Sequence, residues 1–277
     1  MNAEPFDLMT MATRLVMIEG VEAVLLGGSR ARGDHLPSSD YDLGIYYRPS
    51  LDVAGLGRLA REVAGQAAEV TEPGGWGPWV DGGGWLDVAG VRVDWIYRDV
   101  DRVQRAWADA QAGRFAFHRQ PGHQLGVPDF AYIGEVALGV VLADRTGEVT
   151  ALKRAAIDYP SALTTTLVAG LWEPAFEVGA AQKATARGDT VYVAGVIVHA
   201  LLLCAHALHG RAGQWLINEK GAIASAGRLD VAPPDFGARC HTVLAALGTD
   251  PEELATALQG AELIVDDVRA ACAPDPT

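Results

Sequence analysis

The sequence predicts a two-part α/β protein in which a small mixed-sheet domain is followed by an all-helical domain. Two observations carry this prediction. In the first 100 residues, short apolar runs end at glycines, which is typical of strands joined by turns. From about residue 128 onward, long Ala-, Leu- and Val-rich stretches repeat with a helical period. The 277 residues suit one large domain or two ordinary ones, and we place two domains at 1–125 and 126–277.

The first domain is predicted to mix strands and helices, an order that favours a small mixed sheet. The segment "VEAVLLGG" is a strand that stops at glycines, and "YDLGIYY" is a second strand. Farther along, "VAG" fits a tight hairpin turn between two β segments. The expected elements are a helix at 7–18, strands at 21–28 and 41–47, a helix at 51–67, and short β segments near 79–80, 85–88 and 91–97.

The second domain is predicted to be a bundle whose helices break at prolines and glycines. Its most apolar run, residues 191–210, is long enough for a membrane span, but it lies mid-chain, contains three histidines and lacks a basic anchoring flank. We therefore expect a buried helix of a bundle there. The expected breaks are at Pro160, Pro174, Gly188–Asp189 and Gly210.

Charge and cysteine content narrow the possible partners. Lys and Arg total 22 against 35 Asp and Glu, so the net charge is −13. This field repels nucleic-acid phosphates and attracts metal cations or a cationic small molecule. Cys204, Cys240 and Cys272 have no CxxC spacing, which indicates reduced thiols rather than a zinc site. Because no signal peptide is recognised in the first 20 residues, we expect a cytoplasmic protein without a membrane partner.

Two carboxylates stand one residue apart at the mouth of the second predicted strand. Side chains alternate along a strand, so Asp40 and Asp42 project to the same face. Two unit charges about 4 Å apart repel by about 4 kcal/mol at an effective dielectric near 20. Such a pair calls for a compensating cation, and hard oxygen ligands of this kind suit Mg²⁺ shared with substrate phosphates.

A glycine turn and a third acid complete the pattern. Backbone N–H groups at Gly28 and Ser29 can bind phosphate, with Ser29 adding a hydroxyl and Arg30 or Arg32 a charge. The segment "VRVDWIY" supplies Asp94 in an otherwise apolar strand, where an unpaired acid is costly. Each signal alone also fits a structural role, as a turn, a strand cap or a buried acid paired with arginine. Their order along the chain favours a joint function.

The combination "GGS", "SDYDLGI" and "VRVDWIY" resembles the DNA polymerase β-like nucleotidyltransferase superfamily, over roughly residues 20–100. The resemblance implies two Mg²⁺ ions on Asp40 and Asp42, with Asp94 as a third ligand or as the base that activates an acceptor hydroxyl. It implies that Gly28 and Ser29 hold the triphosphate of an NTP, expected to be ATP. We assign Arg30, Arg32 and Ser39 to the same nucleotide-binding set.

The second half is similar to the C-terminal helical domains of bacterial stand-alone nucleotidyltransferases, a group that includes aminoglycoside- and lincosamide-modifying enzymes. The similarity rests mainly on "INEKG", residues 217–221. It implies that Lys220 contacts the nucleotide phosphates; a solvated surface lysine is the alternative.

Several other polar and aromatic residues have two possible roles. Asp189 caps a helix or binds an acceptor amine, with capping favoured. The histidines of the apolar run, at positions 199, 206 and 209, are expected to make hydrogen bonds within the bundle rather than to bind metal. The tryptophans around the hairpin pack together or form a stacking wall for a nucleobase or an acceptor ring. These are Trp76, Trp79, Trp85 and Trp95.

The predicted activity is Mg²⁺-dependent transfer of a nucleoside monophosphate from an NTP to a hydroxyl of a small acceptor, with release of pyrophosphate. The acidic balance makes an aminoglycoside-like acceptor, and hence antibiotic resistance, attractive. The alternative is a regulatory, antitoxin-type nucleotidyltransferase that binds or nucleotidylates a protein partner. An RNase-like Arg-x-x-x-x-x-His signature, which would favour a fused toxin module, is not found in the helical half.

Overall fold

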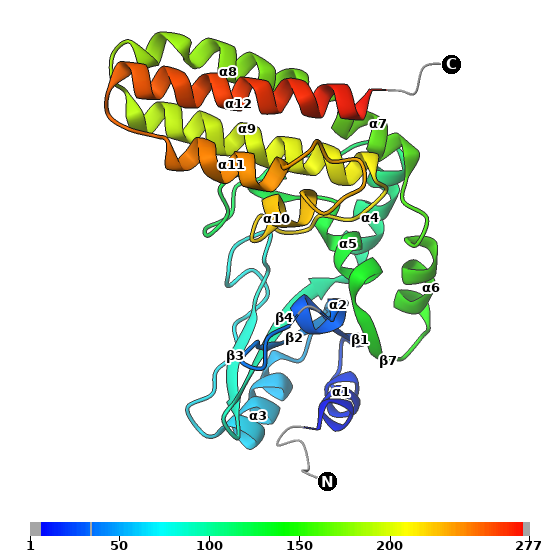
Figure 1. Ribbon diagram of the computed structural model, residues 1–277. Coiled ribbons are helices and arrows are strands. Elements are labelled where there is room, and N and C mark those ends of the chain that lie inside the picture. Colours follow the sequence, from blue (N-terminus) through cyan, green and yellow to red (C-terminus); the bar gives the residue numbers. More distant parts are fainter. Residues whose placement is uncertain (1–6, 34, 274–277) are drawn as a thin grey trace. The chain divides into compact units, whose positions relative to one another are not determined.

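The computed structural model describes residues 7–33 and 35–273 (Figure 1). The chain divides into two compact units, each described here by itself. The first contains residues 1–109 and 127–158, and the second contains residues 110–126 and 159–277.

The first unit is built on a five-stranded mixed sheet, which confirms the predicted mixed α/β class. The strand order is β3-β4-β2-β1-β7; β2 and β4 are parallel, and the other neighbouring pairs are antiparallel. The strands are β1 (Val21–Leu26), β2 (Tyr41–Tyr47), β3 (Gly83–Val88), β4 (Val91–Asp99) and β7 (Val140–Asp144). The unit also contains the two-residue strand β6 (Val127–Pro128).

Six helices accompany this sheet within the residues that the structure describes, and local capping explains where two of them begin. Asp7 accepts hydrogen bonds from the backbone N–H groups of Met9 and Thr10, and Asp52 accepts one from Gly55 N–H at 2.8 Å. The helices are α1 (Leu8–Val16), α2 (Gly28–Arg32), α3 (Val53–Ala64), α4 (Val100–Gln111), which ends at the division between the units, α5 (Ala131–Leu138) and α6 (Glu148–Ala155).

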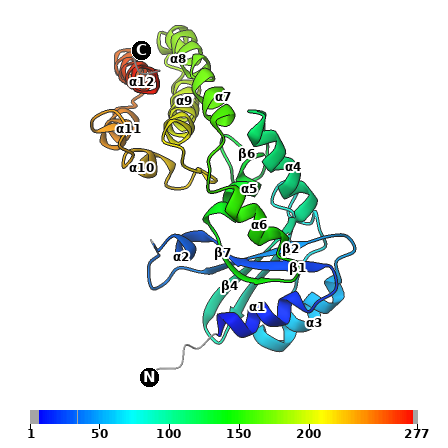
Figure 2. The same ribbon diagram turned by 90° about the vertical axis from the view of Figure 1, so that its right-hand side faces the viewer.

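One face of the sheet is the hydrophobic core of the first unit. Alternate side chains of β2 and β4 are fully buried there, among them Ile45 and Trp95. They pack with apolar side chains of α1 and α3, such as Leu15 and Leu56. Figures 1 and 2 show these two helices on the same side of the sheet. Period-two alternation therefore leaves the opposite side chains of the same strands available for other roles.

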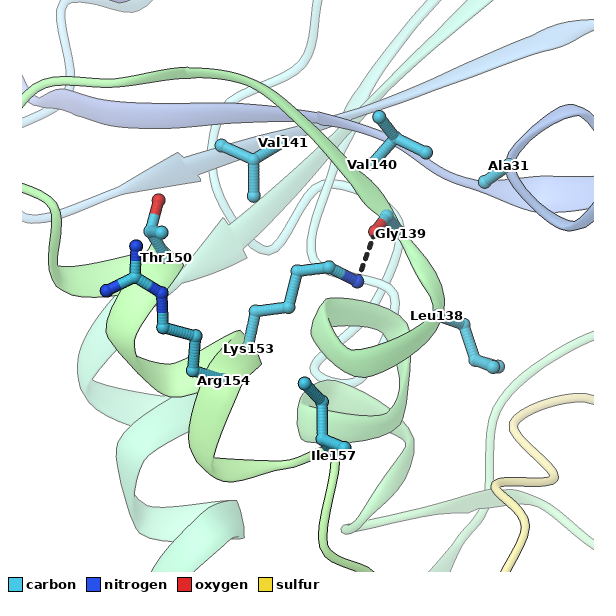
Figure 3. Close-up of a pocket in the computed structure, with 9 residues that line it drawn as sticks. All are labelled: Ala31, Leu138, Gly139, Val140, Val141, Thr150, Lys153, Arg154 and Ile157. Atoms are coloured by element: carbon cyan, nitrogen blue, oxygen red, sulfur yellow. Dashed lines mark hydrogen bonds between the residues drawn. The ribbon is translucent and has the colours of Figure 1, made fainter.

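The segment 127–158 belongs to the first unit because of contacts that its helices and β7 make there. Lys153 of α6 donates hydrogen bonds to the carbonyl oxygens of Ala137 and Gly139, both at 2.7 Å, and so closes the C-terminal end of α5. Figure 3 shows this lysine in a pocket of about 520 Å³ lined by residues of α2, α5, β7 and α6. The lysine has a structural task there, and the three predicted acids do not line this pocket.

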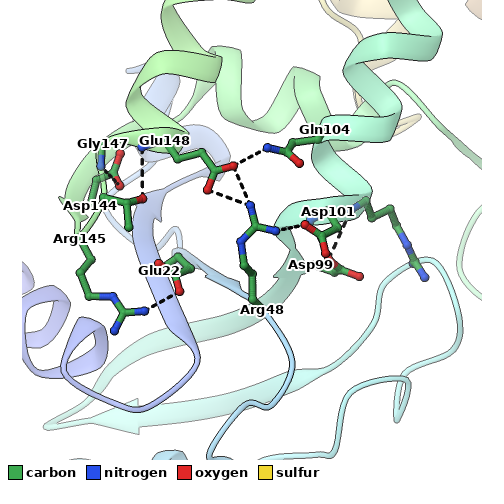
Figure 4. Close-up of polar contacts among 11 residues, drawn as sticks. Glu22, Arg48, Asp99, Asp101, Gln104, Asp144, Arg145, Gly147 and Glu148 are labelled. Atoms are coloured by element: carbon green, nitrogen blue, oxygen red, sulfur yellow. Dashed lines mark hydrogen bonds and ion pairs between the residues drawn. The ribbon is translucent and has the colours of Figure 1, made fainter.

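A polar network also holds this segment to the sheet (Figure 4). Arg48, directly after β2, pairs with Glu148 at 2.7 Å and with Asp101. Glu148 also accepts a hydrogen bond from Gln104. Arg145, directly after β7, pairs with Glu22 of β1. These ion pairs join groups that are 53 to 123 positions apart in the sequence, so local patterns do not reveal them.

Three features of this unit differ from the sequence-based expectations. The compact division does not follow the predicted boundary between residues 125 and 126, because residues 127–158 pack on the first unit and residues 110–126 on the second. The expectation of helices alone after residue 126 was wrong for Val140–Asp144, which forms an edge strand beside β1. The β segment expected at 79–80 is a turn. The strands expected near 85–88 and 91–97 are confirmed.

In its described part, up to residue 273, the second unit is dominated by six helices around one apolar core. Its helices are α7 (Ser161–Ala169), α8 (Trp172–Thr185), α9 (Thr190–Arg211), α10 (Ala222–Ala226), α11 (Phe236–Ala245) and α12 (Pro251–Cys272), and it includes the short strand β5 (Phe117–His118). The three cysteines are buried and form no disulfide.

Helix α9 is the centre of this unit. By length and composition it could cross a membrane, but 61% of its most apolar 18-residue window is buried inside the structure. It packs against α7, α8, α10 and α12, as expected for a buried helix of a bundle. Asp189 caps its first turn by accepting a hydrogen bond from Tyr192 N–H at 3.2 Å, so the favoured capping role is confirmed.

Candidate active site

The sheet register places two of the predicted acids beside each other. Asp42 of β2 stands directly opposite Asp94 of β4 in a parallel pair. Both are partly buried, whereas their neighbours Leu43 and Trp95 are fully buried on the core face. Asp42 and Asp94 therefore project together from the opposite face of the sheet. Asp40, two residues before Asp42, is also partly buried.

The glycine turn after β1 lies against the Asp42 carboxylate. Gly27 N–H donates a hydrogen bond of 2.7 Å to the Asp42 carbonyl oxygen. Gly28 has a φ of +63°, and a Cβ added to it would lie 1.8 Å from Asp42 Oδ2. A side chain at this position is thus excluded both by backbone conformation and by contact with the acid. Ser29 follows in the same turn and is partly buried.

The Asp94 carboxylate is in an environment that disfavours its negative charge. Burial raises its pKa, and the negative charges of Asp42 and Asp40 raise it further; Arg92 acts in the opposite direction. The net result is a pKa of about 6, from an ordinary value of 3.8. Asp42 and Asp94 thus stand side by side with Asp40 close enough to act on Asp94, and the surrounding protein does not fully neutralise their charge.

Asp40 makes an ion pair that leaves hydrogen-bonding capacity unused. Arg92 Nε lies 2.8 Å from Asp40 Oδ1. That oxygen is buried, yet it accepts no hydrogen bond from any residue that the structure describes. The two groups are close enough to form an ion pair, but the Arg92 N–H does not point at the oxygen well enough to make a hydrogen bond. A buried carboxylate oxygen in this state is suited to a further cation.

Two of the residues assigned to nucleotide binding shape the loop before β2. Arg30 donates hydrogen bonds to the carbonyl oxygens of Ser39 (2.8 Å) and Asp40 (3.2 Å), and it stacks on the ring of Tyr41. Ser39 Oγ accepts a hydrogen bond from Leu36 N–H at 3.0 Å. Both side chains therefore hold the acidic loop in place. Arg32 is exposed at the end of α2.

Comparison with known families bears directly on this region. Residues 8–71 match the family model of the nucleotidyltransferase domain. This part of the chain is a nucleotidyltransferase domain. The matched residues include the glycine turn, Asp40 and Asp42. Asp94 lies beyond them, and it is the pairing of β4 with β2 that brings it beside Asp42.

Other comparisons add little detail. One solved structure with a similar course is that of a nucleotidyltransferase-like protein from Exiguobacterium sibiricum, 15% identical in sequence. The alignment covers 93% of this chain and 72% of that chain, with a TM-score of 0.46. No curated protein sequence matches this chain.

Lys220, predicted to contact the nucleotide, lies outside the nucleotidyltransferase domain. It is an exposed residue of the second unit, in the segment before α10. Its backbone N–H donates to Asn218 Oδ1 at 2.8 Å, and Glu219 accepts hydrogen bonds from the backbone N–H groups of Gln124 and Gly126. These contacts define the local backbone of the "NEKG" segment, and the phosphate contact of Lys220 stays a prediction.

Sequence reasoning missed one group of potential metal ligands, in the second unit. Glu173 and Glu177 of α8 and His199 of α9 offer ligand atoms within 4.8 Å of one another. His199 Nδ1 lies 2.7 Å from Glu177 Oε2. The two glutamates are four residues apart and so share a helix face, a spacing that could have revealed them. His206 and His209 are buried instead, and burial lowers the pKa of both.

Proposed function

We propose that the protein catalyses Mg²⁺-dependent transfer of a nucleoside monophosphate from an NTP, expected to be ATP, to a hydroxyl of a small-molecule acceptor, with release of pyrophosphate. The nucleotidyltransferase domain supports nucleotidyl transfer in general. The observation that carries the proposal is the convergence of Asp42, Asp94 and the side-chain-free turn at Gly28 on one face of the sheet.

The residues present fit a divalent metal. Asp40, Asp42 and Asp94 offer hard carboxylate oxygens, the ligands that Mg²⁺ prefers. The raised pKa of Asp94 and the buried Oδ1 of Asp40 indicate negative charge that a cation would compensate. When bound, magnesium would offset the charge of the phosphates and of the oxygens that attack and leave.

The chain's own groups would position the reactants. The missing side chain at Gly28 makes room for the Asp42 carboxylate. Backbone N–H groups of the turn at Gly28 and Ser29, and the Ser29 hydroxyl, can donate hydrogen bonds to a phosphate oxygen. Asp94, with a pKa of about 6, is suited to accept the proton of the acceptor hydroxyl near neutral pH. Alternatively, Asp94 can act as a metal ligand, since it lies beside Asp42.

The acceptor is proposed to be a hydroxylated ring compound that carries amines, such as an aminoglycoside. The net charge of −13 favours a cationic partner over nucleic acid. With three buried, unpaired thiols, the protein suits a reducing compartment, and we propose that it acts in the cytoplasm.

An assay of the purified protein tests this activity. The protein is incubated with each NTP, Mg²⁺ and a panel of aminoglycosides, lincosamides, sugars and proteins, while pyrophosphate and mass shifts of the acceptors are measured. We expect acceptor-dependent pyrophosphate release that Asp42→Asn lowers by at least about 10³-fold. Asp230→Asn, an exposed acid of the second unit, is the matched control and is expected to retain activity.

The outcomes separate the alternatives. Absence of pyrophosphate release with every NTP, or full activity of Asp42→Asn, would contradict the proposed reaction. A mass increase on a protein, with none on small molecules, would instead indicate the regulatory type of nucleotidyltransferase.

A further inference from the structure

Two stacked tryptophans stand at the edge of the sheet that carries the acids. The rings of Trp76 and Trp85 are 4.4 Å apart between centroids and only 16° from parallel. Trp85 belongs to the edge strand β3 and is 71% exposed, although one face of its ring is covered by Trp76. A single exposed apolar residue is common, but this one belongs to a stacked aromatic pair on the strand beside Asp94, and contiguous apolar surface of this kind marks binding sites.

The register of three strands puts Trp85 in line with the acids. Trp85 of β3 stands directly opposite Asp94 of β4, and Asp94 stands directly opposite Asp42 of β2. Directly opposed residues project from the same face, and neighbouring strands are about 4.7–4.9 Å apart. The burial pattern agrees, because Leu86, Trp95 and Leu43, each one position later, are all buried on the other face.

These residues form an ordered row across the sheet. It begins at Gly28, whose missing side chain makes room for the Asp42 carboxylate, and it continues through Asp94 to Trp85. The proposed phosphate turn and the exposed indole therefore lie at opposite ends, with the acids between them. Trp95, on the core face, is fully buried, whereas Trp85 is not. Packing in the core therefore does not explain why a tryptophan stands at position 85.

The chemistry of nucleotidyl transfer predicts that different parts of the substrates lie at the Gly28 end and at the Trp85 end of this row. As the new bond between the acceptor oxygen and the α-phosphorus forms, the bond from phosphorus to pyrophosphate breaks on the opposite side. If pyrophosphate departs toward the glycine turn, the acceptor oxygen approaches from the side of Asp94 and Trp85. The acceptor thus reaches the exposed indole, and the triphosphate does not.

We propose that Trp85, supported by Trp76, is the platform on which the ring of the acceptor lies, and that this ring bears both hydroxyl and amine groups. The inference rests on the proposed function and adds the acceptor subsite to it. An indole face offers apolar contact to a ring and attracts an ammonium group. Asp87, exposed two residues farther along the same face of β3, adds a negative charge for the amines.

Direct binding and kinetics of Trp85 variants test this platform. The probes are kanamycin and lincomycin, two amine-bearing hydroxylated ring compounds, titrated calorimetrically into wild type, Trp85→Ala and Trp85→Phe. We expect Trp85→Ala to weaken binding of the preferred probe roughly tenfold or more, and Trp85→Phe to restore most of it. In the pyrophosphate assay the acceptor KM is expected to rise to a similar extent, while the KM of the NTP changes less than about twofold.

A matched control distinguishes the specific effect of removing Trp85 from the general effect of removing an exposed tryptophan. Trp172 lies in the second unit and is 64% exposed, so Trp172→Ala removes a comparable side chain and is expected to leave probe binding unchanged. Thermal unfolding of each variant shows whether the edge strand still folds, and Trp85→Phe keeps the test decisive should Trp85→Ala fold poorly.

Each outcome decides the inference. Lack of binding of both probes by wild type, or equal binding by Trp85→Ala, would overturn it. A rise confined to the KM of the NTP would also overturn it, since the nucleobase would then occupy the indole. Platform-dependent binding without any pyrophosphate release would uphold the subsite and refute the proposed reaction.

Discussion

The two faces of the sheet in the first unit are made by the same strands but have opposite characters. One face carries Ile45 and Trp95, which are fully buried against α1 and α3. The other carries Asp42, Asp94 and the exposed Trp85 in one row. Because side chains alternate, a single strand contributes to stability through one set of residues and to chemistry through the other. A substitution one position away should therefore change a different property of the molecule.

The largest effect is expected on the acidic face. Asp94→Asn should lower kcat by about 10³-fold or more, because it removes a charged oxygen from the proposed reaction centre. The same change should raise the melting temperature in EDTA at pH 7, since it relieves the cost of burying this charge and the repulsion from Asp42 and Asp40. Asp99→Asn, the same substitution at the far end of β4, is the matched control and should retain kcat.

The pH dependence of stability tests whether Asp94→Asn stabilises the protein in the expected direction. In metal-free wild type, the pKa of Asp94 is about 6, above its ordinary 3.8. The unfolded chain therefore loses this proton first, and the stability that the group contributes is lost as the pH rises from about 4 to about 6. The difference in unfolding free energy between Asp94→Asn and wild type should grow across this interval. A constant difference would contradict the raised pKa of Asp94 and, with it, the burial and charge repulsion that cause it.

A smaller effect, on stability rather than chemistry, is expected on the core face. Ile45→Ala should lower the free energy of unfolding by about 2–5 kcal/mol, because it leaves a cavity among fully buried side chains. Its kcat, measured well below the unfolding temperature, should stay within a few-fold of wild type. The comparison is Ile157→Ala, whose side chain is 72% exposed and whose loss should cost less than about 0.5 kcal/mol. If denaturant titrations gave a similar loss of unfolding free energy for both variants, the assignment of Ile45 to the hydrophobic core would be contradicted.

The smallest effect concerns the second unit. Lys220→Ala should raise the KM of the NTP several-fold and that of the acceptor less, if its ammonium contacts the phosphates as the "NEKG" resemblance implies. Lys183→Ala, at another exposed lysine of that unit, is the control in steady-state kinetics. A change limited to the acceptor KM would contradict the phosphate contact and would assign Lys220 to acceptor binding instead.

Much of the first unit could be predicted from local pattern. The strands β1, β2 and β4 follow from short apolar runs bounded by glycines or acids, and the β3–β4 hairpin from its turn. The edge strand β7 was missed because "VVLAD" is a five-residue apolar run between helical segments, and periodicity cannot separate so short a strand from a helix. Trp79 and Val80 were assigned to a strand from composition, but they lie in a turn.

The candidate site was also predictable in part. The order of the glycine turn, the two nearby acids and the later Asp94 is a property of the sequence, and so is the presence of Asp94 in an otherwise apolar strand. The task of Arg30 was not predictable, because its carbonyl partners are set by the path of the loop. The spacing of Glu173 and Glu177 is visible in the sequence, but His199 joins them only because α8 lies beside α9.

The residue types along each strand, and which of them share a face, follow from the amino-acid sequence alone, because alternation along a strand is a local property of the backbone. That Asp94 lies beside Asp42 and that Trp85 extends the same row follows only from the fold. These residues are brought together by hydrogen bonds between strands that are far apart in the sequence. Strand order and register depend on which pairing buries the whole apolar face, and that choice is made by all the strands and helices together.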